Sequence, residues 1–268
     1  MLWVDGKRLK EGQCIRPYHD TRNYPLKDPN SKDLRCRTPD MSGKGVELCE
    51  VKAGSTISIE WHESDPNDRA ISDSHKGPCL VYLAPLESNG ELDVWIKIFE
   101  DGYDPMTKKW CVDKVIASKG KLDVQIPSDI ASGKYLMRTE IIALHEADRP
   151  YGKDSNSGAE YFSNCAHINI VGGQEGATAP KKYSIPGIYD KNDKGIYFNL
   201  FDKYSSYPIP GPPLYNDKSQ AGSPGGDSNS TNPKPPSPPP KPPAPKPPSP
   251  PQPRRKPCVK KRQIKHRV

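Results

Sequence analysis

Apolar and polar residues alternate in several short runs of this chain, and most of these runs end at turn-forming residues. A period of two places every second side chain on the same face of a strand, so the runs predict half-buried β-strands. No long segment has the apolar spacing of an amphipathic helix. We therefore expect an all-β, antiparallel sandwich joined by long loops. The expected strands lie at 2–4, 57–61, 80–83, 94–99, 122–126, 135–144 and 166–171, and the long loops at 17–48, 100–119 and 146–158.

Proline divides the chain into a folded part and an extended part. Of the 32 prolines, 14 lie between residues 233 and 253. Such a density prevents regular pairing and favours a stiff polyproline II segment. We predict one domain at 1–215, a Ser/Gly-rich and then Pro-rich linker at 216–253, and a disordered basic tail at 254–268.

The positive net charge belongs to the tail. The chain carries +7, but eleven basic residues and no acidic residue follow position 232, so the remainder has a net charge of −4. A nucleic-acid-binding domain would carry its basic residues on the fold, so we expect no nucleic-acid partner. No segment approaches the ~20 apolar residues of a membrane span, so we expect none. The tail is interpreted as solvated, with attachment to acidic polymers as the alternative.

Six of the seven cysteines lie in the predicted domain. They allow up to three disulfides, which indicates an oxidising compartment. The absence of a CxxC pair argues against a structural zinc site. The first residues lack the basic start and apolar run of a signal peptide. Three explanations of this missing signal peptide are open: the start has been trimmed, the gene model begins at an internal methionine, or the protein is cytosolic.

Two histidines, a carboxylate and an aromatic ring fall at the ends of expected strands. They belong to Ser74-His75-Lys76-Gly77-Pro78, to the run from Glu140 to Asp148, and to the run from Gly158 to Cys165. Together with three further segments in the same order along the chain, these runs carry a resemblance to a known family, and the similarity covers Leu2 to Tyr215. The domain resembles the fungal copper-dependent lytic polysaccharide monooxygenases of auxiliary activity family nine, once filed as glycoside hydrolase family 61. The further segments are Val51–Gly54 with Glu60–His62, Trp95–Asp101 and Tyr207–Pro212.

The resemblance implies an immunoglobulin/fibronectin-like β-sandwich and a copper site at its edge. His75 corresponds to a copper ligand, and imidazole nitrogen suits copper. His145, Glu160 and Phe162 correspond to catalytic residues around the metal, where outer groups tune its chemistry. Glu160 replaces the glutamine and Phe162 the axial tyrosine that are usual in the family, so no tyrosyl radical is expected at position 162. Tyr207 corresponds to an aromatic of the flat substrate face.

The family also uses an N-terminal histidine as a copper ligand, and this chain has none at its start. Alignment of Trp3–Gly6 with the family's first strand places Met1 about five residues inside the mature start, a span of about 17 Å at full extension. The Met1 amine is therefore not expected to replace the ligand, and the activity of the chain as given is doubtful. We favour a start upstream of Met1 over a natural relative without this ligand. Cys36 and Cys165 resemble the family's common disulfide.

The function implied by the resemblance is oxidative cleavage of cellulose or related β-1,4-glucans at C1 and/or C4. Copper would use O₂ or H₂O₂ as co-substrate and a redox partner or small reductant as electron donor. The expected protein is secreted, extracellular and monomeric. The alternative is a non-catalytic relative that binds polysaccharide or associates with the cell wall.

Overall fold

The computed structural model of this protein describes residues 1–18, 24–175 and 181–215. The predicted linker at 216–253 and the basic tail lie outside the described residues, so these boundaries remain predictions. Among the described residues, no helix is long and apolar enough to cross a membrane.

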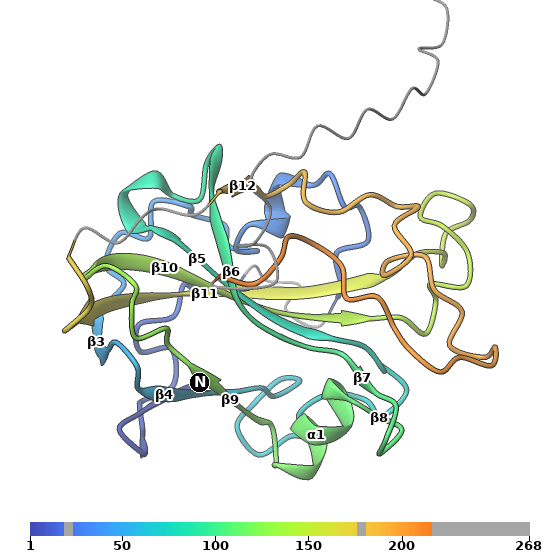
Figure 1. Ribbon diagram of the computed structural model, residues 1–268, viewed down its shortest axis with the longest axis horizontal. Coiled ribbons are helices and arrows are strands. Elements are labelled where there is room, and N and C mark those ends of the chain that lie inside the picture. Colours follow the sequence, from blue (N-terminus) through green and yellow to red (C-terminus); the bar gives the residue numbers. More distant parts are fainter. Residues whose placement is uncertain (19–23, 176–180, 216–268) are drawn as a thin grey trace, which may run out of the picture. The chain divides into compact units, whose positions relative to one another are not determined.

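Two β-sheets lie face to face and form the predicted sandwich (Figure 1). The larger sheet has the strand order β12-β6-β5-β10-β11-β3, the smaller has the order β2-β1-β4-β9, and β7 and β8 form a short ribbon. Described strand pairs are antiparallel, except that β11 and β3 run parallel. The strands are β1 Leu2–Val4, β2 Lys7–Arg8, β3 Cys49–Lys52, β4 Thr56–Glu60, β5 Cys79–Pro85, β6 Asp93–Asp101, β7 Tyr103–Asp104, β8 Lys109–Trp110, β9 Lys121–Gln125, β10 Gly133–Ala143, β11 Glu160–Val171 and β12 Tyr183–Ser184.

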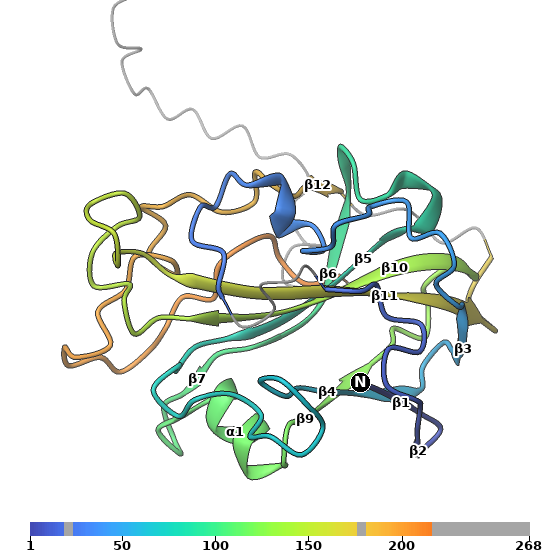
Figure 2. The same cartoon turned by 180° about the vertical axis from the view of Figure 1, so that it is seen from behind.

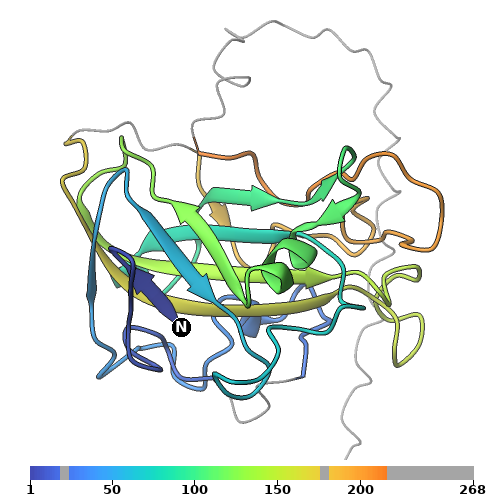
Figure 3. The same ribbon diagram turned by 90° about the horizontal axis from the view of Figure 1, so that it is seen from below.

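The first hydrophobic core lies between the two sheets. Figure 2 shows β1 beside β4, and Figure 3 looks onto the smaller sheet from below. Ile57 and Ile59 of β4 alternate with polar residues and pack in one cluster with Val81 of β5 and Met137 of β10. Burial of each such side chain stabilises the fold by about 1.5–3 kcal/mol. The period-two pattern of the sequence is therefore the pattern of inward-facing positions.

A second core covers the opposite face of the six-stranded sheet. Leu80 and Tyr82 of β5 point into it, and it includes Tyr189 from the segment that follows β12. Tyr189 donates a hydrogen bond to Glu140 Oε2 at 2.6 Å, and Arg138 forms a fully buried ion pair with Glu140. Burial of both faces explains why β5 is a continuous apolar run rather than an alternating one.

The segment expected as a loop at 100–119 contains regular structure, which corrects that expectation. It holds the end of β6, the β7–β8 ribbon and one α-helix, α1 Cys111–Ala117. Asp113 accepts a hydrogen bond from the Trp110 backbone N–H at 2.8 Å and so caps the helix N-terminus. A helix of two turns is too short to show a clear period in the sequence. Two short 3₁₀ helices lie at Lys32–Leu34 and Leu86–Ser88, and β3 was also missed.

Three disulfides join the six cysteines of the domain. They are Cys14–Cys49, Cys36–Cys165 and Cys79–Cys111. The pair that the resemblance implies, Cys36–Cys165, closes a loop of 129 residues and attaches the first long loop to β11. In the chain-entropy account, a loop of this size destabilises the unfolded state by about 5 kcal/mol.

A buried histidine on β11 has a structural role. His167 is 5% exposed, and its Nε2 accepts a hydrogen bond from Arg16 Nε at 2.9 Å. Burial and the Arg16 charge lower the pKa of His167 to about 4. The ring is therefore a neutral acceptor at neutral pH, which the hydrogen bond from Arg16 requires.

Candidate functional site

The segment 74–78 leads into β5 and approaches the end of β10 closely. Leu144 N–H donates to the Lys76 carbonyl at 2.9 Å, which joins the two segments. Gly77 permits the approach, because a Cβ there would lie 1.8 Å from the Ile142 carbonyl oxygen. The backbone around the predicted metal ligand is thus fixed by direct packing against a strand of the larger sheet.

The β10–β11 hairpin supplies the other two polar groups. Glu160 is the first residue of β11 and pairs in register with Ala143, the last residue of β10. His145 follows two positions later, and Gly158 N–H donates to the Glu146 carbonyl at 2.9 Å, which closes the base of the loop. Residues that are distant in sequence therefore lie at one end of the same strand pair.

The structure brings four of the predicted site residues together. Glu160 Oε2 lies 3.7 Å from His75 Nε2 and 3.6 Å from His145 Nε2. The two imidazole rings have centroids 4.2 Å apart, and the Phe162 ring centroid lies 5.6 Å from that of His75. The side chains of His75 and His145 are 23% and 21% exposed, so the site opens to solvent.

Neighbouring groups hold the site residues in place. Lys27 Nζ lies 3.2 Å from Glu160 Oε1, which leaves Oε2 facing the two histidines. Ser74 Oγ lies 3.1 Å from His75 Nδ1, so His75 Nε2 is the nitrogen that faces the carboxylate. His145 Nδ1 is buried and has no hydrogen-bond partner among the described residues.

The electrostatic environment favours a neutral His75. Partial burial is the main cause that lowers its pKa, and the neighbouring His145 lowers it further. Glu160 acts in the opposite direction but does not offset these effects. A neutral imidazole has a free lone pair, which is the form that binds a metal ion.

The three polar residues fit a metal site. Ligand atoms of His75, His145 and Glu160 all lie within 4.8 Å of one another, and this is the one group of three or more potential ligands found in the described part of the chain. Imidazole nitrogen is a ligand for copper, and a carboxylate oxygen beside it adds a hard donor or a proton acceptor. The Nδ1 of His145 is a further buried polar atom that no other described residue satisfies.

Tyr207 is not available to stack on a substrate, which corrects the expectation for this residue. Its side chain is buried in the second core, and its hydroxyl donates to the Gly195 carbonyl at 2.5 Å. Its ring packs edge-on against Trp110 and Phe198. The segment after β12 contributes Tyr207 to that core together with Ile185, Tyr189 and Ile196.

Sequence reasoning missed Lys27 as a site residue. Leu26 and Tyr161 exchange two backbone hydrogen bonds of 3.1 and 2.7 Å, and this antiparallel bridge places Lys27 opposite Glu160. A single lysine in a loop carries no local signal for such a contact across 133 residues. Ser74 stood in a recognised motif, but its contact with His75 could not be inferred from spacing alone.

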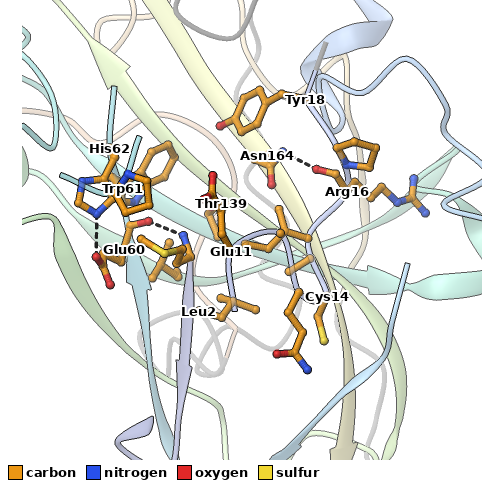
Figure 4. Close-up of a pocket in the computed structure, with 18 of the residues that line it drawn as sticks. Leu2, Glu11, Cys14, Arg16, Tyr18, Glu60, Trp61, His62, Thr139 and Asn164 are labelled. Atoms are coloured by element: carbon orange, nitrogen blue, oxygen red, sulfur yellow. Dashed lines mark hydrogen bonds and ion pairs between the residues drawn. The ribbon is translucent and has the colours of Figure 1, made fainter. Parts of the chain in front are cut away.

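A large cavity lies next to the site, between β1, β4 and β11. Its volume is about 830 Å³, and Met1, Trp61, His75 and Phe162 are among the residues that line it. Figure 4 shows Trp61 and Glu60 on one side and Asn164 and Arg16 on the other. The Met1 amine donates to the Glu60 carbonyl at 2.6 Å, so it is paired with β4. The Trp61 indole N–H is buried without a partner among the described residues.

Comparison with known proteins gives a consistent result. The model of Auxiliary Activity family 9 (formerly GH61) matches residues 1–207. "AA9 family lytic polysaccharide monooxygenase A" of Aspergillus clavatus is 38% identical over 83% of this chain and 61% of its own length. "AA9 family lytic polysaccharide monooxygenase B" of Emericella nidulans is 40% identical over 81% of this chain and 59% of its own length. The chain thus spans about three-fifths of these relatives.

Solved structures with the same fold also match. The structure "CvAA9A" superposes with a TM-score of 0.73 and 36% identity, covering 80% of this chain and 95% of that one. The structure "Extended catalytic domain of H. jecorina LPMO9A a.k.a EG4" superposes with a TM-score of 0.62 and 27% identity, covering 76% of this chain and 79% of that one.

Proposed function

We propose, from the fact that this chain belongs to Auxiliary Activity family 9, that it cleaves cellulose or related β-1,4-glucans oxidatively. The observation that carries the proposal is the convergence of His75, His145 and Glu160 at one open end of the β10–β11 pair. The relatives are named lytic polysaccharide monooxygenases, and the open site suits a polymer more than an enclosed pocket would.

His75 would hold a copper ion through Nε2. Ser74 and the packing of Gly77 fix the ring, and the lowered pKa of His75 keeps it neutral. When bound, copper would supply the redox chemistry that hydroxylates a C–H bond at C1 and/or C4 of the glucan, using either O₂ with two electrons and two protons from outside or H₂O₂, with water as the other product.

His145 and Glu160 would handle protons beside that ion. Glu160 Oε2 faces both imidazoles and can accept a proton, while its Oε1 remains anchored by Lys27. His145 Nε2 can carry a proton toward the same oxygen. Phe162 contributes an apolar ring beside His75 and has no oxygen to offer as a ligand, so its role would be to exclude water.

The protein would act outside the cell as a monomer. Three disulfides in one domain fit an oxidising compartment, and extracellular polysaccharide is accessible only there. The electron donor would be a small reductant or a redox partner protein.

The test uses the mature protein as its source organism secretes it, with its N-terminus determined by mass spectrometry. After copper loading, it is incubated with cellulose and ascorbate, and released oligosaccharides are identified by mass spectrometry. We expect products oxidised at C1 and/or C4, and none from His75→Ala. A correctly folded, copper-bound protein that releases no oxidised product from several β-glucans would refute the proposal.

A further inference from the structure

The residue that follows the predicted metal ligand is held by its side chain as well as by its backbone. The Lys76 ammonium forms an ion pair with the Asp113 carboxylate. The Lys76 carbonyl accepts the hydrogen bond from Leu144 N–H, which lies just after β10. Because Asp113 belongs to α1, two elements that are distant in the sequence hold the same residue.

The segment that contains His75 needs such contacts. Between β4 and β5, residues 61–78 form no helix or strand in the described structure. No ladder of backbone hydrogen bonds therefore fixes His75 from its N-terminal side, where its N–H donates only to the nearby Ser72 carbonyl at 3.1 Å. A segment of this kind opens locally unless tertiary contacts restrain it.

The Asp113 carboxylate is itself held in place. Its Oδ2 accepts the hydrogen bond from the Trp110 backbone N–H at 2.8 Å, so Oδ1 is the oxygen that faces Lys76. The side chains of Lys76 and Asp113 are 33% and 23% exposed, so solvent reaches the pair only in part. An acceptor whose orientation is already fixed positions its partner more precisely than a freely rotating one does.

Helix α1 is a firm base for this ion pair. Its first residue, Cys111, is bonded to Cys79, the first residue of β5. Lys114 Nζ lies 2.8 Å from both carboxylate oxygens of Asp101, which ends β6 and pairs in register with Cys79. Val115 is fully buried in the first core. The helix is therefore attached to two strands of the larger sheet, close to the segment that it supports.

We propose that Asp113 is a positioning residue for the candidate metal site and acts through Lys76 on the neighbouring His75. The ion pair would restrict the backbone of residues 74–78 and so keep His75 Nε2 in its place beside Glu160 Oε2. The inference rests on the proposed function for the identity of the metal.

The experiment measures Cu²⁺ affinity without reductant or glucan, so that it does not depend on turnover. Lys76→Met removes the ammonium, and Asp113→Asn removes the charge but keeps an oxygen for the Trp110 N–H. Each should weaken Cu²⁺ binding to the mature protein by about 2- to 30-fold in calorimetric titration, the usual range for a contact that couples two groups. Lys76→Arg keeps the ion pair and should retain an affinity close to that of the parent.

The same variants are compared by amide hydrogen exchange of the metal-free protein. Exchange in residues 72–77 should be faster in Lys76→Met and Asp113→Asn than in the parent. The double variant should lose no more affinity than either single variant, because both changes remove the same contact.

The matched control is Lys114→Met, which breaks the other ion pair of α1. The Lys114 and Asp101 side chains are 41% and 27% exposed, so the two pairs are comparably accessible. This control should keep the parent's Cu²⁺ affinity and its exchange in residues 72–77. Parent-like affinity in both Lys76→Met and Asp113→Asn, or an equal loss in Lys114→Met, would overturn the positioning role. Affinities that change as expected in a protein that yields no oxidised product would instead refute the proposed activity alone.

Discussion

Gly77→Ala tests whether close backbone packing positions the metal ligand. The new Cβ would lie 1.8 Å from the Ile142 carbonyl oxygen, so the two segments must separate by about 1.5 Å to reach ordinary contact. Overpacking of this kind costs about 1–3 kcal/mol. For a domain of this size, each kcal/mol lowers the melting temperature by about 2–4 °C, so we expect a decrease of about 2–12 °C.

The same shift should weaken metal binding. His75 lies two residues before Gly77, and its Nε2 is 3.7 Å from Glu160 Oε2, so a displacement of this size changes the distances between the ligand atoms substantially. Disturbing the support of a metal ligand typically lowers affinity by about 10- to 100-fold. Calorimetric titration of the mature protein with Cu²⁺ measures the change.

Gly45→Ala is the control for backbone strain alone. Gly45 has φ of +83° and nothing within 4 Å of an added Cβ. It should lose about 1–2 kcal/mol of stability through its left-handed conformation and retain the parent affinity for Cu²⁺. Parent-like affinity in Gly77→Ala, despite a lower melting temperature, would show that the close approach does not position His75.

Three further predictions concern stability. The pKa of His167 is about 4 in the fold and about 6.5 in an unfolded chain, so the free energy of unfolding should fall by at most about 3 kcal/mol as the pH decreases from 6.5 to 4. In His167→Asn, the free energy of unfolding in urea should change less with pH across this range. The same pH dependence in the variant and the parent would contradict the assignment. Glu140→Leu leaves the buried Arg138 guanidinium without its carboxylate, so the free energy of unfolding in urea should decrease by about 3–5 kcal/mol, and by less in Glu140→Gln. A decrease below about 1 kcal/mol in Glu140→Leu would show that the pair contributes little to stability. Replacing both Cys36 and Cys165 with serine should cost about 5 kcal/mol in the same assay, and a cost below about 2 kcal/mol would rule out the loop-entropy account.

Sequence patterns predicted the sandwich because its inner faces follow a local rule. Ile57 and Ile59 alternate with polar neighbours, and each strand of this kind could be located without knowledge of its partners. The strand β3 was not predicted because its four residues lie in a turn-rich region and alternate too few times. The helix α1 was not predicted because its two turns are too short to show a helical period. Pairing order and the parallel β11–β3 contact depend on non-local energetics, which no single segment encodes.

The sequence likewise predicted only part of the candidate site. His75 and His145 could be identified from their motifs, whereas the contact of Lys27 with Glu160 arises from a backbone bridge between segments 133 residues apart. Tyr207 was misjudged because its motif suggested exposure, while the burial of a tyrosine depends on what covers it.

The Lys27–Glu160 pair links the chemistry of the site to its surroundings. A carboxylate stands where the resemblance implies a neutral glutamine, and its charge acts to raise the pKa of His75 against the larger lowering effect of burial. The ammonium of Lys27, 3.2 Å from Oε1, pairs with this carboxylate and leaves Oε2 facing the two histidines. Because the same ammonium also donates to the Asn156 carbonyl, it links the carboxylate to the loop between β10 and β11.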